Sequence, residues 1–339
     1  MIAETGAREG GLDLGRLGAF ARALRDLRAE LHRRIVGQDE VITQVLAAIL
    51  AEGHCLVIGM PGLAKTLLVG SVAELLSLDF KRVQFTPDLM PTDITGTTII
   101  RETPGGGRDF HFLRGPVFAN VLLADEINRT TPKTQAALME AMEERQVSVG
   151  GRRLPLQRPF FVLATQNPIE LEGTYPLPVS ELDRFLFAIL IDYPSEAEEF
   201  RIVVLTTSMY AATLRTVVER DELVRMVDAV PRVAIEPGLL DRAARIVRRT
   251  RPSSPDAPPL VKEFVAWGAG PRATKSIVLA SKAMALMDGR PEVLWQDLQA
   301  VLRPTLRHRI LLRFHAKAEG VSADGVIDEV IGSLEARAA

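Results

Sequence analysis

The chain is short of cysteine, of excess charge of either sign and of long apolar runs, and each shortage excludes a class of protein. Its 339 residues include one cysteine, Cys55, so no disulfide can form within the chain, which fits a reducing cytosol. Lys and Arg (41) nearly balance Asp and Glu (43), so the charge gives no general attraction to nucleic acid. No apolar run approaches the roughly 18 to 20 residues needed to span a bilayer.

Aromatic residues are also scarce, at 5% of the chain. The basic clusters at residues 152–153 and 245–251 are not interleaved with aromatics, as a groove for single-stranded nucleic acid would be.

Residues 1–11 carry acidic residues and glycines without an apolar core, so we do not expect a signal peptide. The length suits two domains with a full core. These features favour a large cytoplasmic enzyme with no membrane span.

What the chain does contain is an apolar stretch, residues 56–58, that runs into a glycine-punctuated loop followed by Lys and Thr. A strand, a glycine-containing loop and a helix in this order are typical of nucleoside triphosphate sites. The unpaired N–H groups at the helix start and the helix dipole attract phosphate. Lys65 would reach the outer phosphates, and the Thr66 hydroxyl would hold a magnesium ion. The predicted nucleotide-binding residues are Gly59, Met60, Pro61, Gly62, Leu63, Ala64, Lys65 and Thr66.

Ala64 departs from the general phosphate-loop pattern, which has glycine before the lysine. We expect the alanine to be tolerated only if its backbone keeps a negative φ and its methyl group points away from the phosphates. The alternative is a glycine- and proline-containing turn that precedes Lys-Thr by chance and has the same sequence pattern without binding phosphate. A second phosphate-site element is therefore needed.

Two adjacent carboxylates, Asp125 and Glu126, supply that element at the end of the apolar run 121–124. Side chains alternate along a strand, so the two acids project differently and can take separate roles. Asp125 can bind magnesium or its water shell, and Glu126 can polarise the attacking water. The alternative is a solvated loop start, which the phosphate loop about sixty residues earlier makes the weaker interpretation.

Apolar stretches alternate with segments of helical spacing through the first half of the chain. This pattern predicts a parallel sheet with helices on both faces and the phosphate loop at the carboxyl end of its first strand. Helices are predicted at 17–34 and 39–51, and further strands at 82–86, 121–124, 159–165 and 185–191.

Two β-hairpins are predicted as excursions from this sheet, with plain surface loops as the alternative. One pairs residues 97–100 with 110–112 around a turn at 104–107. The other pairs residues on either side of Gly150 and Gly151, which can both take the positive φ of a tight turn.

After residue 193 the pattern changes to helices alone. Ser195 and Glu198 form a capping-box start for a helix through residue 208, and the proline-rich stretch 252–259 interrupts the helices. Further helices are predicted at 260–267, 272–287, 293–301 and 322–334. We therefore expect a nucleotide-binding core with an N-terminal helical arm at 1–193 and a smaller all-helical lid domain at 194–339.

Three further polar residues are candidates for catalysis. Asn167, at the end of the fourth strand, could orient the attacking water, or could simply start an Asn-Pro turn. Arg184 precedes the fifth strand and could act on a neighbour's nucleotide as an arginine finger; a surface ion pair with Asp183 or Glu181 is the alternative. Arg272 opens a helix, where a cation is unfavourable to the dipole unless a phosphate partner offsets it.

The sequence resembles the MoxR family of AAA+ ATPases. The resemblance rests on residues 59–66, 123–129, 164–168, 182–185 and 271–273, which occur in the family's order within about residues 34–312. It implies Walker A roles for Lys65 and Thr66 and Walker B roles for the acid pair. It also implies that Asn167 is sensor 1, Arg184 the arginine finger and Arg272 sensor 2, and that alanine is usual at position 64.

The resemblance further implies a hexameric ring with nucleotide between subunits and hairpin insertions facing the pore or surface. Family members look like ATP-driven remodellers or chaperones, commonly working with a partner that carries a von Willebrand factor A domain. The main hypothesis is a Mg²⁺-dependent ATPase that remodels, assembles or activates partner proteins and moves its helical lid against its sheet domain. The alternatives are a nucleic-acid motor and a nucleotide-gated scaffold with little turnover.

Overall fold

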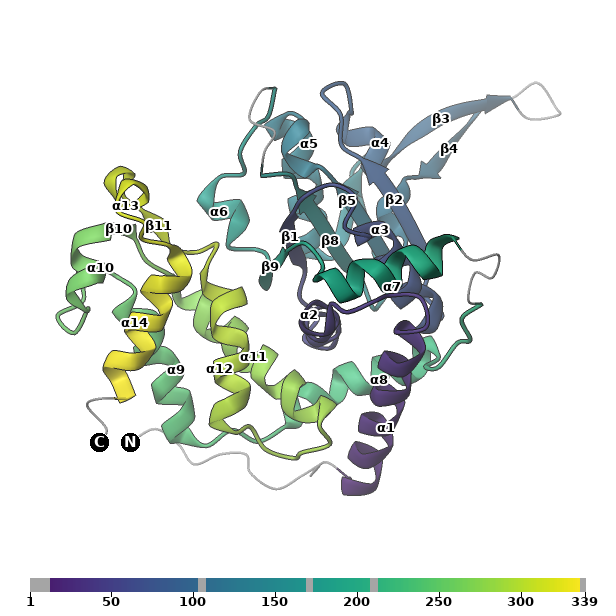
Figure 1. The fold of residues 1–339 in the computed structure, drawn as a ribbon. Helices are drawn as coiled ribbons and strands as arrows, with labels where there is room; N and C mark the ends of the chain where they lie inside the picture. Colours follow the sequence, from purple (N-terminus) through teal and green to yellow (C-terminus); the bar gives the residue numbers. More distant parts are fainter. Residues whose placement is uncertain (1–12, 103–107, 169–172, 208–212, 336–339) are drawn as a thin grey trace, which may run out of the picture.

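A five-stranded parallel sheet forms the centre of the computed structural model, which describes residues 13–102, 108–168, 173–207 and 213–335 (Figure 1). The strand order is β2-β5-β8-β1-β9, and Cys55 of β1 pairs with Leu163 of β8 and Phe187 of β9. Because all five strands are parallel, their carboxyl ends meet at one edge. The strands are β1 (Cys55–Gly59), β2 (Phe80–Gln84), β5 (Val121–Asp125), β8 (Phe161–Gln166) and β9 (Phe187–Ile191).

Helices cover both faces of the sheet, as the unbroken apolar runs of its inner strands require. Alternate residues of β5 separate the two sides: Leu123 belongs to the hydrophobic cluster that contains side chains of α1, α2 and α3, whereas Leu122 belongs to the cluster that contains side chains of α5. The helices are α1 (Leu14–Leu31), α2 (Asp39–Leu50), α3 (Lys65–Leu75) and α5 (Pro132–Glu144), with short turns at α4 (Pro91–Thr95) and α6 (Val179–Leu182). The predicted fold class is confirmed.

Both predicted hairpins are present. β3 (Gly96–Glu102) pairs antiparallel with β4 (Arg108–Arg114), and β6 (Gln146–Val149) with β7 (Arg152–Pro155). In the second hairpin Gly150 and Gly151 have φ of 57° and 75°, as a tight two-residue turn requires. The predicted turn of the first hairpin, 104–107, lies outside the described residues.

The remainder of the chain is mainly helical. Ser195 and Glu198 make the predicted capping box: the Ser195 N–H donates to the Glu198 carboxylate at 2.9 Å, and the Glu198 N–H donates to Ser195 Oγ at 3.4 Å. The helices are α7 (Glu196–Thr207), α8 (Arg220–Ala229), α9 (Pro237–Arg249), α10 (Pro259–Phe264), α11 (Pro271–Met287), α12 (Trp295–Leu306), α13 (Phe314–Ala318) and α14 (Ala323–Glu335).

Some predicted boundaries are wrong, and so is the expectation of helices alone after residue 193. The predicted helix 260–267 ends at Phe264, because β10 (Val265–Trp267) pairs with β11 (Leu311–Leu312). The predicted strand 82–86 runs at 80–84, in register with β5, and the strand expected from 185 begins at Phe187. These shifts reflect pairing with distant segments, which local patterns do not carry.

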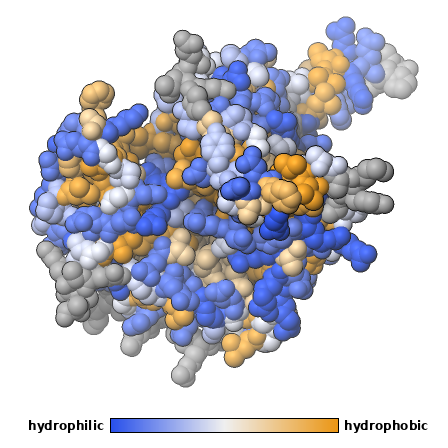
Figure 2. Space-filling model, viewed as in Figure 1, coloured by the Kyte–Doolittle hydropathy of each residue, from blue (hydrophilic) through white to orange (hydrophobic). Residues whose placement is uncertain are grey.

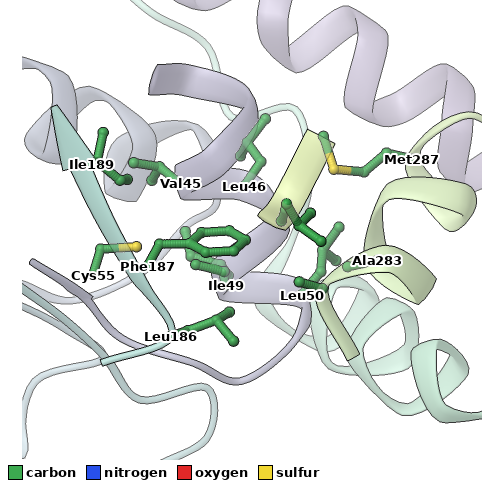
Figure 3. Close-up of a cluster of buried hydrophobic side chains, with 14 of the residues drawn as sticks. Val45, Leu46, Ile49, Leu50, Cys55, Leu186, Phe187, Ile189, Ala283 and Met287 are labelled. Carbon is green, nitrogen blue, oxygen red and sulfur yellow. The ribbon is translucent and has the colours of Figure 1, made fainter. Parts of the chain in front are cut away.

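One hydrophobic cluster joins the sheet to the later helices (Figure 3). In it α2 lies between β9 and α11, so its side chains touch both parts of the chain. Labelled members are Val45, Leu46, Ile49 and Leu50 from α2, Phe187 and Ile189 from β9, and Ala283 and Met287 from α11. Within the described ranges no helix is both long and apolar enough to cross a bilayer.

Candidate functional site

The loop at residues 59–66 connects β1 to α3 at the carboxyl edge of the sheet. Helix α3 begins at Lys65, and its first turn closes with the Leu68 N–H donating to the Ala64 carbonyl at 2.9 Å. The preceding N–H groups therefore belong to the open helix start, where anions bind. Beside the loop is a cavity of about 460 Å³, the loop cavity, lined by Pro61, Gly62, Leu63, Ala64, Lys65, Thr66, Leu67, Arg82, Gln84, Asp125, Glu126, Thr165 and Asn167.

Ala64 has φ of 55°, so the expectation that it keeps a negative φ is wrong. Gly62 also has positive φ, at 86°, and the two residues turn the chain from strand to helix. For alanine this left-handed conformation costs roughly 1–2 kcal/mol. The loop therefore stores backbone strain at the residue before the lysine.

Lys65, the first residue of α3, reaches back across the loop. Its Nζ donates to the carbonyls of Gly59 at 2.7 Å and Met60 at 3.2 Å. Burial lowers the pKa of Lys65 below its usual value. The negative charges of Asp125 and Glu126 oppose this shift but do not cancel it. The ammonium is thus held by the carbonyls of its own loop and feels the charge of the two acids.

Asp125 and Glu126 are joined through the hydroxyl of Thr165 on the neighbouring strand β8. Thr165 Oγ1 donates to Asp125 at 2.6 Å and accepts from the Glu126 N–H at 2.8 Å. Asp125 also pairs with Arg82 Nη2 at 2.6 Å. Parallel pairing of β2, β5 and β8 is what brings these groups to one point.

One oxygen of the Glu126 carboxylate, Oε2, accepts two hydrogen bonds. Gln84 Nε2 donates to it at 2.6 Å and Arg129 Nη1 at 2.8 Å. Its backbone has φ of 57°, a conformation that is rare outside glycine and often found at functional sites. Arg82, Gln84 and Thr165 were not predicted as site residues. Thr165 does end a predicted strand, 159–165, which was the available signal. Arg82 and Gln84 lie at the start and middle of the predicted strand 82–86, and Gln84 ends the strand only because β2 is shifted to residues 80–84.

The structure brings Asn167 into the loop cavity with these acids, as expected for a residue that follows β8. Its side chain is buried. The oxygen donors here, the Thr66 hydroxyl and the Asp125 carboxylate, are of the kind that Mg²⁺ prefers when phosphate completes its shell. No group of three or more His, Cys, Asp or Glu residues in the described ranges could hold a metal by itself.

Arg184 and Arg272 lie together, but not in the loop cavity. They line a separate cavity of about 210 Å³, the arginine cavity, and both pair with Glu143 of α5, at 3.1 Å and 2.7 Å. Arg272 also lies 3.9 Å from Asp183. The ion pair considered for Arg184 thus forms with Glu143, and Arg272 has carboxylate partners at its helix start.

A third cavity, of about 560 Å³, adjoins the loop cavity and shares Pro61, Gly62, Leu63 and Ala64 with it. We call it the apolar cavity; its other walls include Ile35, Val36 and Gln38 and one face of α7. Gln38 Nε2 donates weakly to the Leu63 carbonyl at 3.4 Å. Its buried Oε1 has no hydrogen-bond partner within the described part of the chain. No role was expected for residues 35–38 from the sequence. The available signal was an apolar pair followed by Gly-Gln between the first two helices.

Known proteins share this architecture. Residues 54–187 match the model of the ATPase family associated with various cellular activities (AAA), and residues 259–330 match that of the AAA lid domain. A crystal structure of a Cytophaga hutchinsonii protein, described as a candidate ATPase, superposes with a TM-score of 0.88 and 36% identity, covering 94% of this chain and 96% of that one.

Curated relatives agree along nearly the whole chain. Chaperone MoxR1 of Mycobacterium tuberculosis is 42% identical, covering 94% of this chain and 83% of that protein. Protein MoxR of Paracoccus denitrificans is 32% identical, over 85% of this chain and 88% of that protein. The chain therefore belongs to the MoxR family of AAA+ ATPases, and its enzymatic activity is ATP hydrolysis.

Proposed function

We propose that the loop cavity binds Mg²⁺-ATP and hydrolyses it. The observation that carries the proposal is the meeting in one cavity of Lys65, Thr66, Asp125, Glu126 and Asn167, which come from three distant segments. Thr66 and Asp125 would hold Mg²⁺, which supplies charge neutralisation for the phosphates. Lys65 would exchange its carbonyl partners for phosphate oxygens, Glu126 would accept a proton from the attacking water, and Asn167 would orient that water.

The apolar cavity would take the adenine base. It continues directly from the loop cavity, and its apolar walls suit a flat aromatic ring. The unpartnered Gln38 oxygen is an acceptor that the exocyclic amino group of adenine would satisfy. Guanine has a carbonyl in place of this amino group and would leave the Gln38 oxygen without a donor. We therefore expect ATP to be preferred to GTP.

Arg184 and Arg272 would act on the nucleotide of a neighbouring subunit in a ring, which we propose to be hexameric. Support comes from their location, because both lie in the arginine cavity rather than beside Lys65. An arginine supplied by a neighbour neutralises charge that develops during phosphoryl transfer. Glu143 would occupy the two guanidinium groups until the neighbour's phosphate replaces it.

We propose that turnover drives remodelling, assembly or activation of partner proteins, as the name of the mycobacterial chaperone suggests. A protein with a von Willebrand factor A domain would be the working partner. The cytoplasm, which supplies ATP, would be the compartment. The two-domain division at residue 193 remains part of this proposal.

Mixing two inactive variants tests the shared site. Lys65→Ala should abolish ATP binding, and Arg184→Ala should abolish turnover while ATP still binds. A mixture of the two should regain part of the wild-type turnover, because a Lys65→Ala subunit lends its arginines to a neighbour with an intact loop. Arg245→Ala, which removes an exposed ion pair on α9, is the matched control and should leave turnover unchanged.

Absence of rescue on mixing, or full turnover of the Arg184→Ala variant, would refute the shared site. Glu126→Gln should retain bound ATP, and it provides a trap with which to isolate the client protein. DNA-stimulated turnover with a steep salt dependence would favour the nucleic-acid motor instead. ATP binding with no turnover at any protein concentration would favour the scaffold.

A further inference from the structure

The corner of the molecule formed by β10, β11 and α13 exposes an apolar patch, the corner patch, made of Trp267, Leu311 and Phe314. Their exposed fractions are 66%, 49% and 100%. Trp267 and Leu311 are direct cross-strand partners, so their side chains are neighbours, and Phe314 begins the next helix. A tryptophan and a fully exposed phenylalanine together are typical of a protein contact.

Helix α7 exposes a second patch, the α7 ridge, made of Phe200, Val203 and Val204. Their exposed fractions are 69%, 53% and 52%. Spacings of three and four residues put them on one side of the helix. Figure 2 shows apolar side chains gathered over α7 and, on a separate part of the surface near α13, an apolar protrusion among hydrophilic side chains.

Each patch lies beside a different part of the proposed shared site. Only residues 268–270 separate β10 from α11, whose second residue is Arg272, so a short link joins the corner patch to the element that carries this arginine. Helix α7 lines the apolar cavity next to the phosphate loop, so the α7 ridge adjoins the nucleotide site. In Figure 1 α13 and α7 lie on opposite flanks.

The charges around the two patches are complementary. The first turn of α7 carries three glutamates, Glu196, Glu198 and Glu199, and one cation, Arg201, follows Phe200, so this end of the helix is net acidic. Phe314 is flanked by Arg313, and Lys317 lies on the same short helix, with Glu319 following it. Opposite charges steer an association and set its register, whereas contact between two corner patches would bring like charges together.

We propose that the corner patch of one copy of this chain docks on the α7 ridge of the next copy. This inference rests on the proposed shared site and names the surfaces that assemble it. The contact is head-to-tail, so each copy uses both patches, and repetition builds a ring where the rotation between copies closes. It carries Arg184 and Arg272 toward the neighbour's loop cavity, and it covers six apolar side chains that are exposed in the single chain.

Paired cysteines test the contact, because the native Cys55 is completely buried and will not compete. A Val204→Cys variant mixed with a Phe314→Cys variant, in the presence of a non-hydrolysable ATP analogue and a mild oxidant, should give a disulfide-linked heterodimer. The matched control pairs Phe314→Cys with Leu240→Cys, an exposed leucine of α9 outside both patches. That pair should stay uncross-linked.

Charge exchange gives a second test that does not depend on oxidation. Glu196→Lys alone and Lys317→Glu alone should each raise the protein concentration needed for half-maximal ATPase activity by about 10-fold or more. The two changes in one chain should restore much of the loss, because the pair regains opposite signs. ATP affinity, measured by direct binding, should stay at the wild-type value in all three variants.

Several outcomes overturn the inference and separate it from the proposed function. If the assembled complex forms but the control pair cross-links as readily as the test pair, or only Phe314→Cys homodimers appear, the docking surfaces are wrong while the shared site stands. The same holds if the double charge variant is no better than the single ones. If no complex forms and turnover per subunit is independent of concentration, the shared site itself fails.

Discussion

Ala64 shows how a single backbone angle affects the nucleotide loop. Its φ of 55° is accessible to glycine without cost, whereas the alanine side chain crowds the backbone. The loop accepts this strain at the entry to α3, where the chain must turn sharply between strand and helix. Strain of this kind is common where a loop must present its N–H groups to a ligand.

Replacing Ala64 with glycine should raise the free energy of unfolding by about 1 kcal/mol, because the strain disappears. Ala51→Gly is the matched control, since Ala51 has φ of −80° and gains nothing from glycine. That variant should lower the free energy of unfolding by about 0.5–1 kcal/mol. Urea denaturation of both variants measures the difference, and an equal loss in both would show that the loop is not strained.

His54 is a second residue whose environment has a measurable consequence. Its Nδ1 accepts the Val162 N–H at 3.0 Å, so Nε2 carries the proton and donates to the Met142 carbonyl at 3.2 Å. Burial lowers the pKa of His54 to about 4. The folded protein therefore keeps this imidazole neutral at pH values where the unfolded chain protonates it.

The pKa of His54 is about 6.5 in the unfolded chain and about 4 in the folded protein, so between these pH values the unfolded state binds more protons. The free energy of unfolding must therefore fall as the pH is lowered from about 6.5 toward about 4. At about pH 5 the loss attributable to His54 should be about 2 kcal/mol relative to neutral pH. Urea denaturation at both pH values should show a smaller loss for His54→Gln. Some loss should remain, because burial also lowers the pKa of His308. An unchanged loss in the variant would exclude His54 as the cause.

At the scale of elements, the β3–β4 hairpin projects from the body of the molecule and depends on close backbone contact at its base (Figure 1). Gly115 follows β4, and a Cβ there would lie 2.2 Å from the Ile94 carbonyl oxygen. Backbone atoms cannot move aside as a flexible side chain can. The hairpin's angle to the sheet is thus set by a residue outside its strands.

Gly115→Ala should lower the free energy of unfolding by about 1–3 kcal/mol through this clash. Gly70→Ala in α3 is the matched control, because its nearest heavy atom is 3.8 Å from the added Cβ. Alanine should stabilise that helix by about 0.5–1 kcal/mol. Thermal unfolding of the two variants should therefore shift in opposite directions, and a shift upward in both would contradict the close contact.

At the scale of the whole molecule, the sheet and the later helices share one core through α2 (Figure 3). Displacing the lid from its own sheet would expose this apolar surface to water. The shared core therefore resists motion of the lid within one chain. The shared core favours movement of each lid together with the sheet to which it is joined, in place of the motion of lid against sheet that we expected from the sequence.

A single cooperative transition should follow from this shared core. The two tryptophans, Trp267 and Trp295, both lie in the later helical part, so their fluorescence reports on the lid, while binding of an ATP analogue reports on the sheet. Leu50→Ala should lower stability by about 2–5 kcal/mol and shift both signals together. Separate transitions, or a shift in one signal only, would show that lid and sheet unfold independently.

Much of the site was predictable from the sequence because its parts are local. The phosphate loop, the Asp125–Glu126 pair and Asn167 each follow an apolar strand, and parallel strands bring their carboxyl ends to one edge. The hairpins were predictable for the same reason, since turn residues join strands that are close in the chain. The β10–β11 pair was not, because its strands are short and far apart in sequence.

The sequence by itself determined which side chains can carry phosphate and acid chemistry, and the tertiary structure decided where the remaining parts lie. Packing of α11 against α2, which itself covers the sheet, put Arg272 beside Arg184 and Glu143 rather than beside Lys65. It also put Gln38 at the apolar cavity, and the corner patch and the α7 ridge on opposite flanks. The physical reason is that a motif depends on neighbouring residues, whereas these placements depend on burial between elements distant in the chain.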